Sequence, residues 1–270
     1  MWEQEWEQLL SSKDFKVSLV KFELIEIDST IKISGEEFDI SSLSYLLNIL
    51  KKIKSKHNNK NIKIIGNFNS KLLLNLLLKN KNFEKIDKVL HLFQEISKII
   101  QESKIIFTSE IKGIAKGPAL EIALACNFIK ASNDVILYLH QDNLGIMPFF
   151  GTAQRLSRLI GYSETLKAFL IDKTLNYEKC LMLDLVNHNT DNVVKIKNNK
   201  TFWDQTFTNT FIFYNSKIHS QYKNQITQYN ALLSTIFESC ICDYEAGPEI
   251  EKRWLKWLIN KEYLDGIKAK

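Results

Sequence analysis

Hydrophobic positions along the first two thirds of the chain switch repeatedly between two spacings. Runs rich in β-branched and aromatic residues predict strands at residues 17–27, 31–33, 62–65, 105–111 and 135–139. Between them, apolar residues recur at the helical interval. The clearest stripe, over residues 83–101, comprises Ile86, Val89, Leu90, Phe93, Ile96, Ile99 and Ile100. This repeated strand–helix–strand order predicts an α/β fold.

The N-terminal part contains two further signals. The strands at 17–27 and 31–33 predict a hairpin-like start, followed by a turn at residues 35–37. Ser41 or Ser42 is placed to cap the next helix, because a serine hydroxyl accepts hydrogen bonds from the first backbone N–H groups of a helix. That helix carries Leu43, Leu46, Leu47, Ile49 and Leu50.

Beyond residue 197 the composition changes. Residues 198–200 read Asn-Asn-Lys and predict a linker, and residues 201–270 are rich in aromatic residues at helical spacing. Gly247-Pro248 breaks this segment, and a helix is expected to resume over residues 249–264. We therefore expect a core at residues 1–197 and a C-terminal helical segment at residues 198–270.

Unusual backbone geometry is concentrated between residues 111 and 161. This window holds five of the chain's nine glycines and two of its three prolines. Residues 113–118 are expected to break the strand before them, and Pro118 suits the first turn of a helix. The run Ala119–Cys126 is apolar except for Glu121. The pattern thus predicts a buried helix with Glu121 in its first turn.

Glu121 admits two interpretations. It can simply face the positive end of the helix, an effect of roughly 0.3–1 kcal/mol. Alternatively, a carboxylate in an apolar cleft has a perturbed pKa and can move protons. The local pattern favours neither.

A second structured block follows. The strand at 135–139 leads into a polar loop at 140–143 and a loop with apolar walls at 144–151. A helix is predicted over residues 153–159, with Gly161 as its C-terminal cap. Strands, glycine-rich turn, buried helix and polar loop together predict an α/β arrangement with a cleft at the strand ends.

This window resembles the crotonase family, the enoyl-CoA hydratase/isomerase group. Gly113, Ala115, Gly117 and Glu121 keep the family's Gly-x-Ala-x-Gly-Gly-Gly-x-Glu spacing, and residues 144–161 look like its second block. The resemblance implies a spiral of ββα turns. It also implies a C-terminal helical layer that covers the active site and joins subunits, as a trimer or a dimer of trimers.

The resemblance also assigns site residues. It implies Glu121 as the acid/base group, in a pocket made by Gly117, Ala119, Gly145, Pro148 and Phe149. The family holds the thioester oxygen with two backbone N–H groups, whose positions fall here on Leu72 and Pro118. Proline has no N–H, and the family's loop motif is absent around Leu72. The hydratases' second glutamate falls on Gln141, beside Asp142.

Two functions of different classes follow from these departures. The first is an enzyme of the lyase/isomerase class in fatty acid metabolism, acting on an acyl-CoA or acyl-carrier thioester. A single Glu121 favours isomerisation, since hydration needs one group to activate water and another to deliver a proton; Asp142 supplies a second carboxylate only if its loop is displaced by one residue. The second is an inactive crotonase-fold binding or assembly subunit. Another thioester or carrier-linked reaction is a third reading.

Composition and charge bear on four further properties: nucleic-acid binding, membrane insertion, secretion and metal binding. The net charge of +5 comes from dispersed lysines with three arginines, which does not match the clustered basic face of a nucleic-acid-binding module. No apolar run approaches the roughly 20 residues of a membrane helix, and the acidic start is no signal peptide. The four cysteines lack metal-site spacing. We expect a cytoplasmic protein with reduced cysteines, no metal, and no cofactor other than the CoA of its substrate.

Overall fold

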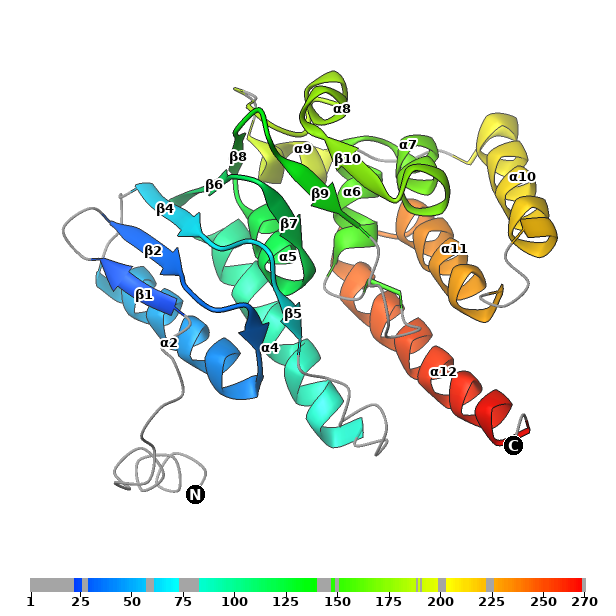
Figure 1. The fold of residues 1–270 in the computed structure, drawn as a ribbon, viewed down its shortest axis with the longest axis horizontal. Helices are drawn as coiled ribbons and strands as arrows, with labels where there is room; N and C mark the ends of the chain where they lie inside the picture. The colour runs from blue at the N-terminus through cyan, green and yellow to red at the C-terminus, as the bar shows by residue number, and fades with distance from the viewer. Residues whose placement is uncertain are drawn as a thin grey trace.

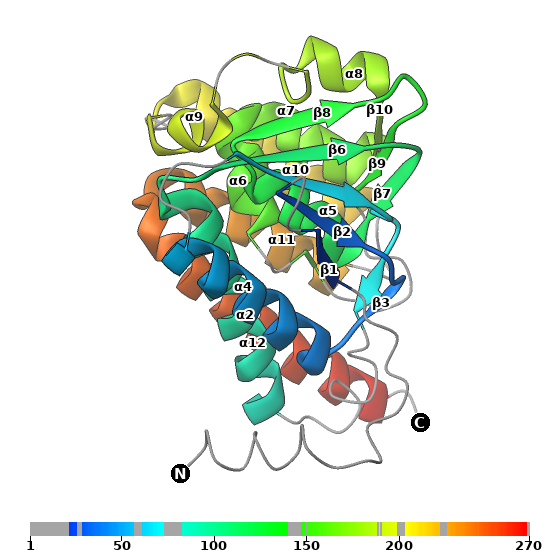
Figure 2. The ribbon, with the colours of Figure 1, turned by 90° about the vertical axis from the view of Figure 1, so that its left-hand side faces the viewer.

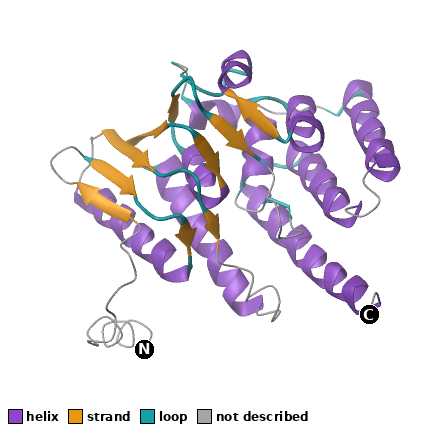
Figure 3. Cartoon of the chain, in the orientation of Figure 1, coloured by secondary structure: helices purple, strands orange, loops and turns teal. Residues whose placement is uncertain are grey.

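The computed structural model describes residues 22–25, 29–56, 61–72, 83–139, 147–148, 151–187, 189, 191–198, 203–221 and 226–268. Strands gather on one side of the molecule and the C-terminal helices lie on the other (Figure 3). The predicted α/β class is confirmed.

The larger sheet is built from the first strand of each successive turn of the chain (Figure 1). Its hydrogen-bonded order is β1 (Phe22–Ile25), β2 (Thr30–Ile33), β4 (Asn61–Gly66), β6 (Ile106–Ile111) and β8 (Phe128–Ala131). β1 and β2 are antiparallel, which confirms the hairpin-like start, and the other neighbours are parallel. Residues 17–21 and 26–28 of the predicted first strand lie outside the described residues.

A short second strand follows each of β2, β4, β6 and β8. β3 (Glu37–Phe38) pairs with β5 (Lys71–Leu72), while β7 (Ile114–Lys116) pairs with β9 (Ile136–Tyr138), which also pairs with β10 (Thr174–Asn176). A bridge between Asn69 and Lys116 links the two ladders. This repetition of strand, short strand and helix confirms the predicted ββα spiral. It also corrects two details, because the break at 113–118 contains β7 and the turn at 35–37 leads directly into β3.

Helices α2 (Ile40–Lys56) and α4 (Phe83–Glu102) run side by side against the larger sheet (Figure 2). The predicted apolar stripe of α4 is buried in full. The N-terminal cap of α2 differs from the prediction. Asp39 Oδ1 accepts the Ser42 N–H at 2.8 Å, while the Ser42 hydroxyl accepts the Asp39 N–H at 2.8 Å. The reciprocal pair places the cap at Asp39, two residues before Ser41 and three before Ser42.

The central helix α5 (Gly117–Ala125) is buried, as predicted. It begins at Gly117, so Glu121 lies in the second turn and not in the first. The helix dipole acts within the first turn, and the first interpretation of Glu121 is therefore wrong in its geometry. The next helices are α6 (Thr152–Leu159), α7 (Tyr162–Lys167), a π-helical turn η1 (Ala168–Asp172), α8 (Tyr177–Met182) and α9 (Asn192–Asn198). The predicted cap at Gly161 is corrected: Ile160 is the C-cap of α6, and Gly161, with φ +84° and ψ 155°, is the N-cap of α7 and lacks the left-handed helical conformation of a capping glycine.

The C-terminal segment is helical, as predicted, and comprises α10 (Gln205–Gln221), α11 (Ile226–Ile241), a 3₁₀ turn η2 (Tyr244–Ala246) and α12 (Gly247–Lys268). α11 packs on α6 and α7, and α12 reaches back to α4 (Figure 1). Gly247 and Pro248 open α12 instead of preceding it, since proline fits the first helical turn. Within the part of the chain that the structure describes, no helix combines the length and apolar run needed to cross a bilayer. The domain boundary near residue 197 stays a prediction.

Candidate functional site

The loop after β4 lies flush against the start of α5. The Lys116 N–H donates to the Phe68 carbonyl at 2.9 Å, and the Ser70 N–H donates to the Lys116 carbonyl at 3.2 Å. Gly117 has φ +63°, and a Cβ there would lie 2.1 Å from the Ser70 carbonyl oxygen. Glycine is therefore needed at 117 both for its backbone angle and for the close approach of the loop.

The Ser70 hydroxyl occupies the N-terminus of α5. Its Oγ accepts the Ala119 N–H at 2.9 Å and donates to the Lys116 carbonyl at 3.1 Å. A serine hydroxyl has a single proton to donate, and that proton is already used. Because Pro118 has no N–H and the Ala119 N–H is engaged, neither position offers a donor to a bound carbonyl oxygen.

Glu121 points from α5 to α6. Its Oε2 lies 3.9 Å from Arg155 Nη1, and both side chains are buried. Burial raises the pKa of Glu121 to about 8; the Arg155 charge and the Thr152 backbone N–H act against this, and Glu251 adds to it. Oε2 accepts no hydrogen bond from the described residues. A carboxyl in this setting holds its proton near neutral pH.

Arg155 joins three elements. Its Nη2 donates to Ser97 Oγ on α4 at 2.6 Å, and its Nη1 faces Glu121 on α5. Gly151 makes room for the guanidinium, since a Cβ there would lie 2.7 Å from Nη1. The φ of Gly151, +87°, also requires glycine.

A second buried carboxyl comes from α12. Glu251 Oε2 accepts the Gly151 N–H at 2.6 Å, and Oε1 has no hydrogen-bond partner among the described residues, although the Gln154 N–H also faces this carboxyl. Burial raises the pKa of Glu251 to about 7, and the Arg155 charge opposes the rise. Glu121, Arg155 and Glu251 form a cluster that we call the α5–α6–α12 charge cluster. With two carboxyls and one guanidinium, it favours keeping one proton at neutral pH.

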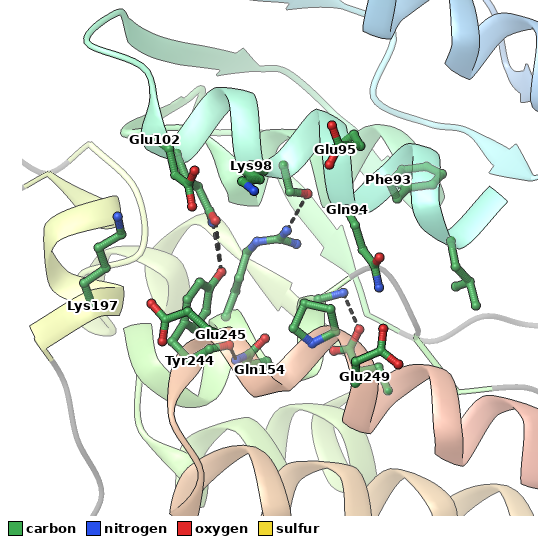
Figure 4. A pocket seen from close by; sticks show the side chains of 17 residues that line it. Phe93, Gln94, Glu95, Lys98, Glu102, Gln154, Lys197, Tyr244, Glu245 and Glu249 are labelled. Carbon is green, nitrogen blue, oxygen red and sulfur yellow. Dashed lines mark hydrogen bonds between the residues drawn. The ribbon is translucent and has the colours of Figure 1, made fainter. Parts of the chain in front are cut away.

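A cavity of about 340 Å³ opens over part of this cluster (Figure 4). α4 supplies one wall, with Gln94 and Lys98, while Tyr244 of η2 and Glu249 of α12 face it from the other side (Figure 4). Arg155 and Glu251 line it, whereas Ser70, Pro118, Ala119 and Glu121 do not. The cavity is therefore separate from the start of α5.

The other predicted site residues divide into two groups. Leu72 lies in β5, beside α5, and pairs with Phe38 of β3; Pro148 is buried. Gln141, Asp142, Gly145 and Phe149 lie outside the described residues. No cluster of three or more metal-ligating side chains occurs among the residues that the structure describes.

Sequence reasoning missed Ser70 and Glu251. Ser70 meets the Ala119 N–H across 49 positions of sequence, and Glu251 meets Gly151 across 100. Nothing local distinguishes Glu251 from its exposed neighbour Glu249. The one available signal was its place in the helix, four residues before the buried Leu255 and therefore on the same face.

Comparison with known proteins gives one family. The profile described as Enoyl-CoA hydratase/isomerase matches residues 75–257. A curated relative, the peroxisomal fatty acid beta-oxidation multifunctional protein AIM1 of Arabidopsis thaliana, is 30% identical over 112 residues, which is 39% of this chain and 16% of that protein. The chain thus matches only a small part of that relative.

Solved structures resemble the chain over most of its length. An enoyl-CoA hydratase from Bacillus halodurans has a TM-score of 0.60 at 18% identity, covering 90% of this chain and 95% of that one. An enoyl-CoA hydratase from Mycobacterium avium subsp. paratuberculosis K-10 has a TM-score of 0.59 at 14% identity, with the same coverage. HypX from Aquifex aeolicus has a TM-score of 0.58 at 16% identity, covering 88% of this chain and 42% of that one. At these identities the likeness concerns the fold.

Proposed function

Because the chain belongs to the enoyl-CoA hydratase/isomerase family, we propose that it keeps the family's fold without the thioester chemistry, as a binding or assembly subunit. The observation that carries this proposal is the hydrogen bond from the Ala119 N–H to Ser70 Oγ at 2.9 Å, next to a proline. The ligand proposed for such a subunit is a CoA or carrier thioester, the substrate class of the family.

The start of α5 lacks the free N–H donors that would stabilise negative charge on a thioester oxygen. Removing one preorganised donor from an oxyanion site slows other enzymes about 10²- to 10³-fold. Here Pro118 provides no donor, and Ser70 Oγ takes the donor of Ala119. Glu121 adds a second obstacle, because its carboxyl is buried against Arg155 and does not line the cavity above the charge cluster.

The test uses purified protein with crotonyl-CoA for hydration and a 3-enoyl-CoA for isomerisation. We expect no turnover above the uncatalysed rate, with CoA binding measured in parallel by isothermal titration calorimetry. Glu121→Gln should leave both rates unchanged. Turnover that disappears in Glu121→Gln would overturn the proposal.

A double variant gives a positive control. Ser70→Ala with Pro118→Gly removes the competing hydroxyl and restores a backbone N–H at position 118. If closure of this site is what prevents catalysis, the double variant should gain measurable isomerisation that depends on Glu121. An equally inactive double variant that folds and binds CoA would show that more than these two groups is missing.

One observation favours an active isomerase as the second candidate. The pKa of Glu121, about 8, suits a group that takes up and returns a proton near neutral pH. Isomerisation needs a single carboxylate to remove a proton from one carbon and deliver it to another. In that case the wild-type protein converts the 3-enoyl thioester, Glu121→Gln abolishes conversion, and hydration stays undetectable.

A further inference from the structure

The cavity above the charge cluster has the features of a ligand site. It is bounded by α4, α6, α9, η2 and α12, and its floor contains the buried side chains of Arg155 and Glu251. Its volume, about 340 Å³, is at the lower end for small-molecule pockets. Phe93, Pro248 and the ring of Tyr244 give it apolar walls (Figure 4).

Glu251 is the buried carboxyl that lines this cavity. The residue is only 2% exposed, and its Oε1 accepts no hydrogen bond from the described residues. A buried acceptor in this state has lost its hydrogen bonds to water without replacing them, and the loss is larger when the group is charged. The Arg155 charge partly offsets the burial of Glu251, but the same guanidinium also donates to Ser97 Oγ and lies 3.9 Å from Glu121 Oε2.

The charges around the cavity favour a positive ligand. Five glutamates line it against two lysines and one arginine, and these are Glu95, Glu102, Glu245, Glu249, Glu251, Lys98, Lys197 and Arg155. Glu121 lies behind Arg155 and offsets its charge. The net potential of the lining is thus negative, which raises the local concentration of cations.

Tyr244 indicates which cation fits. Its ring already stacks with one guanidinium, since Arg158 Cζ lies 5.6 Å from the ring centroid. Gln101 Nε2 donates to the Tyr244 hydroxyl at 2.9 Å and fixes the ring as a cavity wall (Figure 4). Tyr244 and Glu251 line the same cavity. An aromatic ring and a carboxylate in one cavity can bind a nitrogen cation through the ring face and through a charge-assisted hydrogen bond.

We propose that this cavity binds a small organic cation, with a guanidinium or primary ammonium group donating to Glu251 and the body of the molecule between Phe93 and Tyr244. The site goes beyond the proposed function, because none of the residues at the start of α5 takes part. Gln94 and Gln101 provide neutral groups for a second polar end of the ligand.

Agmatine, which carries a guanidinium and an amine, is the probe, and butylurea is its neutral counterpart. In calorimetric titrations at low salt and about pH 8, agmatine should bind with a dissociation constant below about 1 mM, and butylurea should not bind. Glu251→Gln should weaken agmatine binding at least about tenfold, since the amide keeps the Gly151 hydrogen bond but loses the charge. The matched control is Glu110→Gln on β6, which makes the same substitution far from the cavity and should leave affinity unchanged.

Proton release provides a second readout. The cation stabilises the Glu251 carboxylate, so binding at about pH 7 should release protons, measured from the dependence of the heat on the buffer's ionisation enthalpy. Arg155 on α6 and Glu121 on α5 act electrostatically on Glu251, and the other charged groups that line the cavity are Glu95, Lys98 and Glu102 on α4, Lys197 on α9, Glu245 on η2 and Glu249 on α12. Affinity should therefore rise with pH through about 7 to 8.

One further variant and one further ligand complete the test. Tyr244→Leu changes a partly exposed position and leaves the buried charges intact, so it should weaken binding even if Glu251→Gln folds poorly. A blocked tripeptide, acetyl-Gly-Arg-Gly-amide, distinguishes a protein side chain from a free small molecule as the source of the cation: binding as tight as agmatine assigns the site to a partner's arginine. Absence of agmatine binding, equal binding of butylurea, or binding unaffected by both substitutions would overturn the proposal.

Discussion

Two regions around Glu121, the start of α5 and the α5–α6–α12 charge cluster, differ in how completely their polar groups are hydrogen-bonded. At the start of α5, the Ala119 N–H and the Ser70 hydroxyl satisfy each other and the Lys116 carbonyl. In the charge cluster, the carboxyl groups of Glu121 and Glu251 share the Arg155 guanidinium, and an oxygen of each is left without a hydrogen bond from the described residues. The first region is closed and complete, while the second is buried and under-satisfied. Such under-satisfied groups mark places where a proton or a ligand is bound.

The largest effect should come from removing the shared cation. Arg155→Met leaves Glu121 and Glu251 buried without a counter-charge, which should reduce the free energy of unfolding by about 3–5 kcal/mol at neutral pH. Urea unfolding followed by circular dichroism measures it. The loss should shrink near pH 5, where both carboxyls are protonated. Arg253→Met is the matched control, because Arg253 pairs with Glu238 at an exposed site and should change stability by less than about 1 kcal/mol.

The pH dependence of stability comes next in size. Both carboxyls have folded-state pKa values of about 8 and 7, above the ordinary value of 4.5. The folded protein therefore retains protons that the unfolded chain releases, so this contribution to stability is present below about pH 4.5 and is lost as pH rises to about 8. The expected slope is on the order of 1 kcal/mol per pH unit for each proton.

The double variant Glu121→Gln/Glu251→Gln isolates this effect. Other titrating groups remain in both proteins, so the difference between the two stability–pH curves reports the pair alone. The wild-type curve should fall relative to the variant between about pH 5 and 8. Parallel curves over that range would contradict the raised pKa values. They would mean that both carboxyls are ionised in the folded protein, because the attraction of Arg155 outweighs the cost of burying their charges.

At the start of α5, the corresponding perturbation is Ser70→Ala. It leaves the buried Ala119 N–H without its acceptor, and should cost about 1–3 kcal/mol. Ser44→Ala provides the comparison, since that hydroxyl donates to the Ile40 carbonyl within α2 and the carbonyl keeps its helical partner. A Ser70→Ala variant as stable as Ser44→Ala would indicate that water replaces the hydroxyl as the acceptor of the Ala119 N–H. That result would contradict the description of this region as closed.

The smallest predicted effect is the difference in stability loss between alanine substitutions at two glycines. Gly151 and Gly113 both have positive φ, at +87° and +62°, but a Cβ at 151 meets Arg155 Nη1 at 2.7 Å, whereas a Cβ at 113 meets Asp134 Oδ2 at 3.8 Å. Alanine should cost about 1 kcal/mol at either position through its backbone angle. At 151 it should cost roughly 1–2 kcal/mol more, because it displaces the guanidinium. Equal losses in thermal unfolding would show that the side chain of Arg155 moves aside freely.

Features of the fold and the site could be predicted where the interacting residues are close together in the sequence. The stripe of α4, the strands and the buried α5 are set by neighbours within a few residues. The ββα spiral was implied by the resemblance to the crotonase family, which Gly113 and Gly117 help to carry. Ser70 and Glu251 could not be found in the same way, because their partners lie 49 and 100 residues away. Glu121 stood out in the sequence as the one charge in an apolar run. Its partners, and therefore its pKa, depend on how α6 and α12 pack.

Glu251 lies on α12, which the ribosome makes after every other element described here. A nascent chain that has already assembled its sheets still lacks the group that binds the Gly151 N–H and faces Arg155. Folding of this region therefore finishes only when α12 emerges and docks against α11 and α4. A chain stalled or cut before Gly247 would expose the cavity floor to water, and quality-control proteases could recognise it as incomplete.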